Sequence, residues 1–138
     1  MCLLRQLLFT RRVERRKLKM LQFFMKAVFN KINSIEELEE VFAKSNEKPV
    51  AVFKHSTTCP ISLDVYQEIK NVAGEVNLVV VQTARSISNE IAARTGIRHE
   101  SPQALVLKEG KAIYHASHYD IRADDVNSKL ETQMSASS

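Results

Sequence analysis

The 138-residue chain has few cysteines and no long apolar run, and these two absences limit the classes of protein to which it can belong. Its two cysteines, Cys2 and Cys59, cannot form the disulfide framework that stabilises many small secreted domains. No apolar run reaches the roughly eighteen residues of a membrane-spanning helix. The length fits one domain. A usable lone thiol fits a reducing compartment, so we expect a cytoplasmic protein.

Only the N-terminal segment carries a net positive charge. Residues 1–26 hold eight of the 20 Lys and Arg residues and one acid, Glu14, for a net charge of +7. Residues 27–138 hold the other twelve with fifteen acids, for a net charge of −3. We therefore expect no nucleic-acid binding by the folded body, because only the N-terminal segment can attract polyanions.

The N-terminal segment has a short apolar stretch followed by basic residues, which reverses the order of a secretory signal. We expect residues 1–25 to be a basic extension outside the fold, with Met20 or Met25 as a candidate start. The alternative is a basic amphipathic helix, so we expect membrane contact only if residues 1–24 provide it.

Strand-like apolar runs and helical stripes alternate along residues 26–134, which we expect to form one domain followed by a frayed tail at 135–138. The patterns predict strands at 27–32, 49–54, 77–83, 103–108 and 111–115 and helices at 34–44, 60–73, 87–95 and 121–132. The alternation predicts an α/β fold with a parallel sheet covered by helices on both faces. A tight turn at Glu109-Gly110 makes the last two strands an antiparallel edge, so the five-stranded sheet is mixed.

Particular residues refine this pattern. The run Leu78–Val81 is apolar throughout, as expected for a strand buried on both faces, and we place it between the first two strands. Ser34 and Glu37 match a capping box at the start of the first helix. Asp120 is the expected cap of the last helix.

Cys59 lies where a predicted strand ends and a predicted helix begins. Pro60 suits the first helical turn because its missing N–H would have no partner there. A thiol at this point faces unpaired backbone N–H groups and the positive end of the helix dipole, which favour the nucleophilic thiolate. Thr58 can cap the helix. The alternative, a small buried Cys, fits the strand-Cys-Pro-helix context less well.

The order of elements, the Cys-x-x-x motif and the proline that opens the fourth strand resemble the thioredoxin superfamily. Gly96–Arg98, Ser101-Pro102 and Lys108–Gly110 look like its loop, cis-proline and terminal hairpin. Within that superfamily, Thr58–Ser62 and His115–Asp120 are similar to the monothiol bacilliredoxins of bacteria that use the small thiol bacillithiol. The resemblance spans about residues 26–134 and implies a thioredoxin-like fold.

The resemblance also implies a cis peptide bond before Pro102. It would place Ser101 and Pro102 against Cys59, with the Ser101 backbone free to pair with an extended substrate. From the sequence alone, a trans proline at the start of a strand remains equally open.

A dithiol oxidoreductase needs a second cysteine three residues after the first, and Ser62 occupies that position. Cys59 therefore lacks a resolving partner in its motif, which leaves attack on a mixed disulfide between a protein and a small thiol. The resemblance names bacillithiol as that co-substrate and S-bacillithiolated proteins as clients, with no bound cofactor. Ser62 can donate to the thiolate, or it can be a solvated or first-turn serine.

Several alternatives concern charged and metal-binding groups. Bacillithiol carries carboxylates, and Arg98 and His99, before Pro102, are the nearest basic candidates to bind them. His55 is expected to be packed or solvated rather than a general base. The histidines of the 115–118 run match no zinc spacing with Cys59, so we expect no metal. An iron–sulfur carrier in which two chains and two small thiols hold the cluster remains the alternative function.

Overall fold

The structure is a computed structural model that describes residues 26–136, with side chains through residue 131. The expected extension, residues 1–25, lies outside this range. The elements in chain order are β1 (Val28–Lys31), α2 (Ile35–Ser45), β2 (Val50–His55), α3 (Pro60–Ile69), β3 (Glu75–Val80), α4 (Arg85–Thr95), β4 (Gln103–Lys108), β5 (Lys111–Ser117), the short 3-10 helix η1 (His118–Asp120) and α5 (Ala123–Ala136). In the described part, no helix is both long and apolar enough to cross a membrane.

The five strands form one mixed sheet in the order β1-β3-β2-β4-β5. β3 runs parallel to both β1 and β2 and lies between them, which confirms the predicted position of the apolar run. β4 runs antiparallel to β2 and β5 runs antiparallel to β4, so the predicted mixed sheet is also confirmed. The C-terminal ends of the three parallel strands therefore share one edge with the start of β4.

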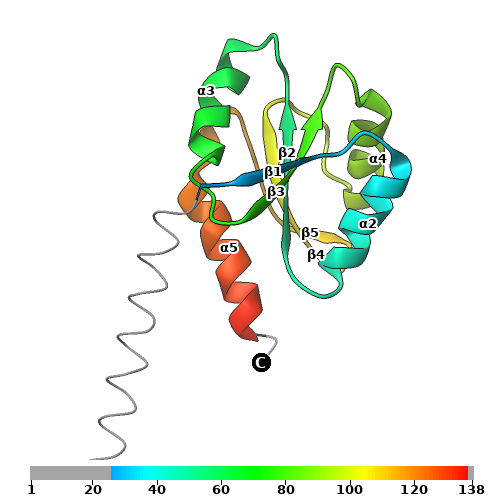
Figure 1. The fold of residues 1–138 in the computed structure, drawn as a ribbon, viewed down its shortest axis with the longest axis vertical. Coiled ribbons are helices and arrows are strands. Elements are labelled where there is room, and N and C mark those ends of the chain that lie inside the picture. Colours follow the sequence, from blue (N-terminus) through cyan, green and yellow to red (C-terminus); the bar gives the residue numbers. More distant parts are fainter. Residues whose placement is uncertain (1–25, 137–138) are drawn as a thin grey trace, which may run out of the picture.

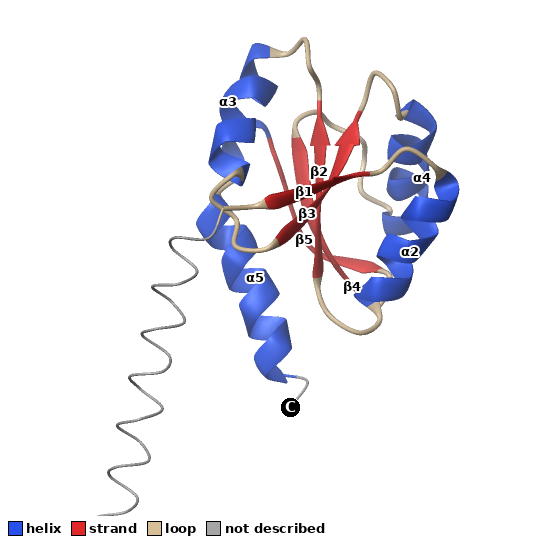
Figure 2. Ribbon diagram, viewed as in Figure 1, coloured by secondary structure: helices blue, strands red, loops and turns tan. Residues whose placement is uncertain are grey.

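Helices cover both faces of the sheet, with α2 and α4 on one side and α3 and α5 on the other (Figures 1 and 2). Successive side chains of β2 point to opposite faces of the sheet, so this strand contributes to the core on both sides. Val52 packs into the core under α2 and α4, whereas the next residue, Phe53, packs into the core under α3 and α5. A central strand buried on both faces explains why the first four residues of β2, 50–53, are all apolar.

The hairpin between β4 and β5 has two loop residues, as predicted. Glu109 and Gly110 have φ values of 53° and 73°, and two successive positive values make the turn that matches the twist of paired strands. Ser45, at the end of α2, accepts the Glu109 N–H at 2.7 Å through its carbonyl and the Gly110 N–H at 3.0 Å through its hydroxyl.

The ends of several elements differ from the prediction. Ser34 caps α2 as expected, since its hydroxyl accepts the Glu37 N–H at 3.1 Å. α3 stops at Ile69 rather than residue 73, because the following residues form tighter three-residue turns. Asp120 does not cap the last helix. It lies in η1, and the N–H of Ala123, where α5 begins, donates instead to Glu68 Oε1 at 3.0 Å.

Candidate active site

Cys59 occupies the N-cap position of α3, as the strand-Cys-Pro-helix pattern predicted. The Cys59 backbone is extended (φ −93°, ψ 119°), and Pro60 is the first helical residue. The Cys59 carbonyl accepts the Leu63 N–H at 3.1 Å. The thiol is free and partly exposed, so the buried-Cys alternative does not hold. Its side chain accepts no capping hydrogen bond, which leaves the thiol beside the unpaired N–H groups of the first turn.

The loop before Cys59 is held from the side by Gln82, which follows β3. The Gln82 amide nitrogen donates to Ser56 Oγ at 2.7 Å and to Thr58 Oγ1 at 3.2 Å. Its oxygen accepts the Thr57 N–H at 3.3 Å. Thr58 is therefore part of a loop clamp and is not the helix cap, a position that Cys59 itself takes. The sequence carried no signal for Gln82, because the clamp joins segments 24 to 26 residues apart.

Ser62 is fully buried, and its hydroxyl supports this loop from beneath. Ser62 Oγ accepts the Ser56 N–H at 2.9 Å and lies 2.7 Å from His55 Nδ1. Ser62 lies in the first turn of α3, as one alternative expected, but it is buried rather than solvated. Its hydroxyl bonds to His55 and Ser56 and not to the Cys59 thiol. His55 is packed, as expected, with its ring 4.9 Å from that of Tyr66. Burial lowers the pKa of His55.

The Ser101–Pro102 peptide bond is cis, the geometry that the resemblance implies. Lys54 at the end of β2 pairs with Gln103 at the start of β4, so the loop to Cys59 and the segment ending in Pro102 leave the sheet at the same edge. Pro102 is buried and its carbonyl accepts the His118 N–H at 3.0 Å, which ties η1 to it. The Ser101 hydroxyl is buried without a hydrogen-bond partner.

Tyr119 in η1 is a site residue that the sequence analysis did not single out. It is 62% exposed, and its hydroxyl donates to Oδ2 of Asp64, in α3, at 3.0 Å. This hydrogen bond raises the pKa of Tyr119, with smaller contributions from burial and from the charges of Asp64 and Cys59. Through Asp64, Tyr119 is tied to the helix that begins after Cys59. The run His115–Asp120 was the available signal.

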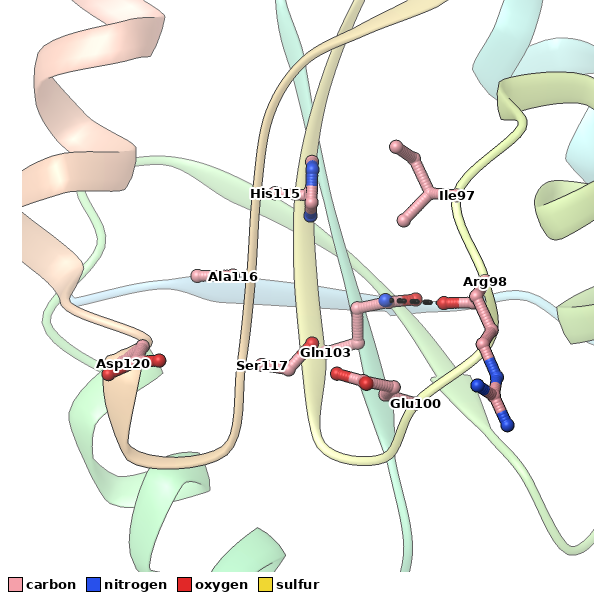
Figure 3. A pocket seen from close by; sticks show the side chains of 8 residues that line it. All are labelled: Ile97, Arg98, Glu100, Gln103, His115, Ala116, Ser117 and Asp120. Carbon is pink, nitrogen blue, oxygen red and sulfur yellow. Dashed lines mark hydrogen bonds between the residues drawn. The ribbon is translucent and has the colours of Figure 1, made fainter.

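Arg98 and His99, the two expected binding residues, have different surroundings. Gln103 Nε2 donates to the Arg98 carbonyl at 2.9 Å, while the Arg98 guanidinium is exposed and points away from Gln103 (Figure 3). His99 is partly buried, with Nδ1 2.8 Å from Ser88 Oγ and 3.4 Å from Lys54 Nζ. Arg98 is thus free to meet a ligand, whereas His99 is engaged from below.

A cavity of about 370 Å³ lies beside this loop. Figure 3 shows its lining: Ile97, Arg98, Glu100, Gln103, His115, Ala116, Ser117 and Asp120. The Gln103 oxygen is buried without a partner. Within the described residues, no three His, Cys, Asp or Glu side chains are grouped so that they could hold a metal ion.

Comparison with known proteins decides the family. The sequence pattern of the monothiol bacilliredoxin BrxC matches residues 30–126, which is more than half of the chain. The chain belongs to the monothiol bacilliredoxin family. A solved protein described as having a thioredoxin fold is 33% identical, with a TM-score of 0.68 over 75% of this chain and 94% of that one.

More distant structures share the fold. Thioredoxin from Trypanosoma brucei brucei is 12% identical and matches 78% of this chain and 92% of its own, with a TM-score of 0.62. A thioredoxin from Nicotiana alata is 16% identical and matches 76% of this chain and 91% of its own, with a TM-score of 0.58. The bacilliredoxin thus has the expected thioredoxin-like α/β fold, and its family supports a thiol redox function.

Proposed function

We propose that this bacilliredoxin removes bacillithiol from protein mixed disulfides through Cys59. The observation that carries the proposal is the contrast between Cys59 and Ser62. The first presents a free, partly exposed thiol at the start of α3, and the second buries a hydroxyl where a dithiol enzyme has its second sulfur. The motif therefore favours a reaction that ends with the small thiol on Cys59.

The reaction is a thiol–disulfide exchange. The Cys59 thiolate attacks the bacillithiol sulfur of the mixed disulfide, and a new S–S bond forms as the bond to the client sulfur breaks. The client leaves as a thiolate and takes a proton from solvent. Cys59 is oxidised to a mixed disulfide and the client cysteine is reduced, so no other oxidant or reductant is needed in this step.

Regeneration needs a second thiol. A free bacillithiol thiolate attacks the bacillithiol sulfur on Cys59, which releases bacillithiol disulfide and restores the Cys59 thiolate. A separate reductase then returns that disulfide to two thiols. Bacillithiol acts here as co-substrate and no bound cofactor is required. The reaction needs free bacillithiol in its thiol form, so we expect it to take place in a reducing cytoplasm.

Binding of the mixed disulfide uses the edge where β2 ends and β4 begins. The Ser101 backbone beside the cis-proline pairs with an extended client segment, and the exposed Tyr119 ring offers it an apolar contact. Pro60 begins α3 and fixes the backbone of its first turn beside the thiolate. The outward guanidinium of Arg98 suits a carboxylate of bacillithiol.

The test is release of bacillithiol from an S-bacillithiolated client, measured with purified protein and free bacillithiol. We expect release by the wild type and by Cys2→Ser, and none above background with Cys59→Ser. If Cys59→Ser releases bacillithiol at the wild-type rate, the proposal is wrong. A brown protein with visible absorbance after anaerobic purification would instead favour the iron–sulfur carrier.

A further inference from the structure

Lys54 is the most unusual charged residue of the described fold. Its side chain is 0% exposed, although a fully buried lysine is rarely found without a charged partner. No carboxylate forms an ion pair with it among the described residues. Burial without such a partner penalises the ammonium and lowers the pKa of Lys54 to about 8. A methionine of similar length would avoid this penalty, so the need for stability does not explain the lysine.

The Lys54 ammonium contacts two segments, α4 and the loop before Pro102, near the end of β2 that leads to Cys59. Nζ donates to the Ser88 carbonyl, in α4, at 3.1 Å and lies 3.4 Å from His99 Nδ1. An ammonium offers only donors, so a hydrogen bond between these two atoms uses His99 Nδ1 as the acceptor and requires the tautomer with its ring proton on Nε2. The Ser88 hydroxyl, 2.8 Å from the same Nδ1, completes a three-residue group under the loop.

A second buried side chain holds the neighbouring loop residue. Gln103 is 1% exposed and pairs with Lys54 across β2 and β4. Its amide donates to the Arg98 carbonyl at 2.9 Å. Two adjacent loop residues, Arg98 and His99, are therefore fixed from below by two paired residues of the sheet. The loop continues through Ser101 into the cis-proline.

We propose that Lys54 is a positioning residue that holds the Arg98–Ser101 segment where it receives the client beside Cys59. The inference rests on the proposed function, because it assigns a role in binding the same mixed disulfide. Lys54 acts through His99 and does not touch the reacting sulfurs. Its loss therefore weakens client binding and leaves the chemistry of Cys59 unchanged.

The variants are Lys54→Met, which keeps the length of the side chain without its donors, and Lys48→Met, a control at an exposed lysine. We expect Lys54→Met to raise the KM for an S-bacillithiolated client by roughly five- to tenfold, the size of one typical net hydrogen bond, with kcat within about twofold. Alkylation of Cys59 by iodoacetamide should stay within about twofold of wild type. Lys48→Met should change neither quantity.

Hydrogen exchange of the amides at 98–101 tests the anchoring without any substrate. We expect faster exchange in Lys54→Met than in Lys48→Met, and the double variant with His99→Ala should resemble His99→Ala alone. If Lys54→Met does not fold, His99→Ala alone should still raise KM without slowing alkylation. Unchanged loop exchange, an unchanged KM, or alkylation that slows in parallel with turnover would overturn the positioning role. A wild-type protein that releases no bacillithiol would instead refute the proposed function, and the exchange data would still decide the anchoring.

Discussion

Ser62 shows how one oxygen supports the loop that carries the reactive thiol. Its hydroxyl accepts the Ser56 N–H and contacts His55 Nδ1, so two polar groups at the end of β2 depend on it. A second cysteine at this position would offer a weak donor and acceptor in place of the hydroxyl. The serine thus excludes a resolving thiol and also closes the loop from Ser56 to Cys59.

Ser62→Ala should therefore destabilise the protein by about 1–3 kcal/mol, the cost of leaving buried polar groups without partners. Urea unfolding at neutral pH measures the change. Ser86→Ala, at an exposed serine of α4, is the control and should shift stability by less than about 0.5 kcal/mol. Equal effects of the two substitutions would show that the Ser62 hydrogen bonds contribute little.

The buried Lys54 should make the stability of the protein depend on pH. Its pKa is about 8 in the folded protein and 10.5 in the unfolded chain, so the unfolded state binds more protons between these values. Stability from this residue is complete above pH 10.5 and is lost as the pH falls through 8. Relative to Lys54→Met, the wild type should gain roughly 3 kcal/mol between pH 7 and pH 10.5.

Chemical denaturation of both proteins across this pH range measures the difference. Lys48→Met should differ from wild type by a constant amount, because Lys48 is exposed. A pH-independent difference for Lys54→Met as well would show that the ammonium is not penalised by burial. The sequence could not predict this residue, since a lysine that ends a strand normally reaches solvent.

At the scale of elements, the loop between β2 and α3 depends on Gln82. Gln82→Ala removes the amide that bridges Ser56, Thr57 and Thr58 while leaving the core intact. We expect the Thr57 amide to exchange with solvent roughly fivefold faster, since one net hydrogen bond contributes about 1 kcal/mol. Gln67→Ala, at an exposed position on α3, should leave that amide unchanged, and an equal rate in both variants would argue against the clamp.

Elements with local patterns were predictable, and contacts between distant segments were not. The apolar run at 78–81 placed β3 in the interior of the sheet, between β1 and β2, and Glu109-Gly110 marked the hairpin. The Ser34 cap also followed from neighbouring residues. Thr58 and Asp120 have the chemistry of caps, but Cys59 and the Glu68 side chain take those roles. Tyr119 reaches α3 only because η1 is tied to Pro102.

At the scale of the whole molecule, the sheet and its two helical layers are described for residues 26–136, and we expect residues 1–25 to lie outside this fold. Deleting residues 1–24 should therefore leave the alkylation rate of Cys59 unchanged and shift the melting temperature only slightly. Calorimetry and iodoacetamide kinetics of the full-length and shortened chains measure both. A large loss of stability or reactivity would show that the extension belongs to the fold.

The central claim is that Cys59 receives the small thiol, and intact mass spectrometry tests it most directly. The protein is mixed briefly with an excess of S-bacillithiolated client in the absence of free bacillithiol and then quenched with acid. We expect a mass increase equal to one bacillithiol in disulfide linkage, located on the Cys59 peptide and removed by reductant. Cys2→Ser should give the same adduct. No adduct on Cys59 while the client is still released in reduced form would contradict the claim.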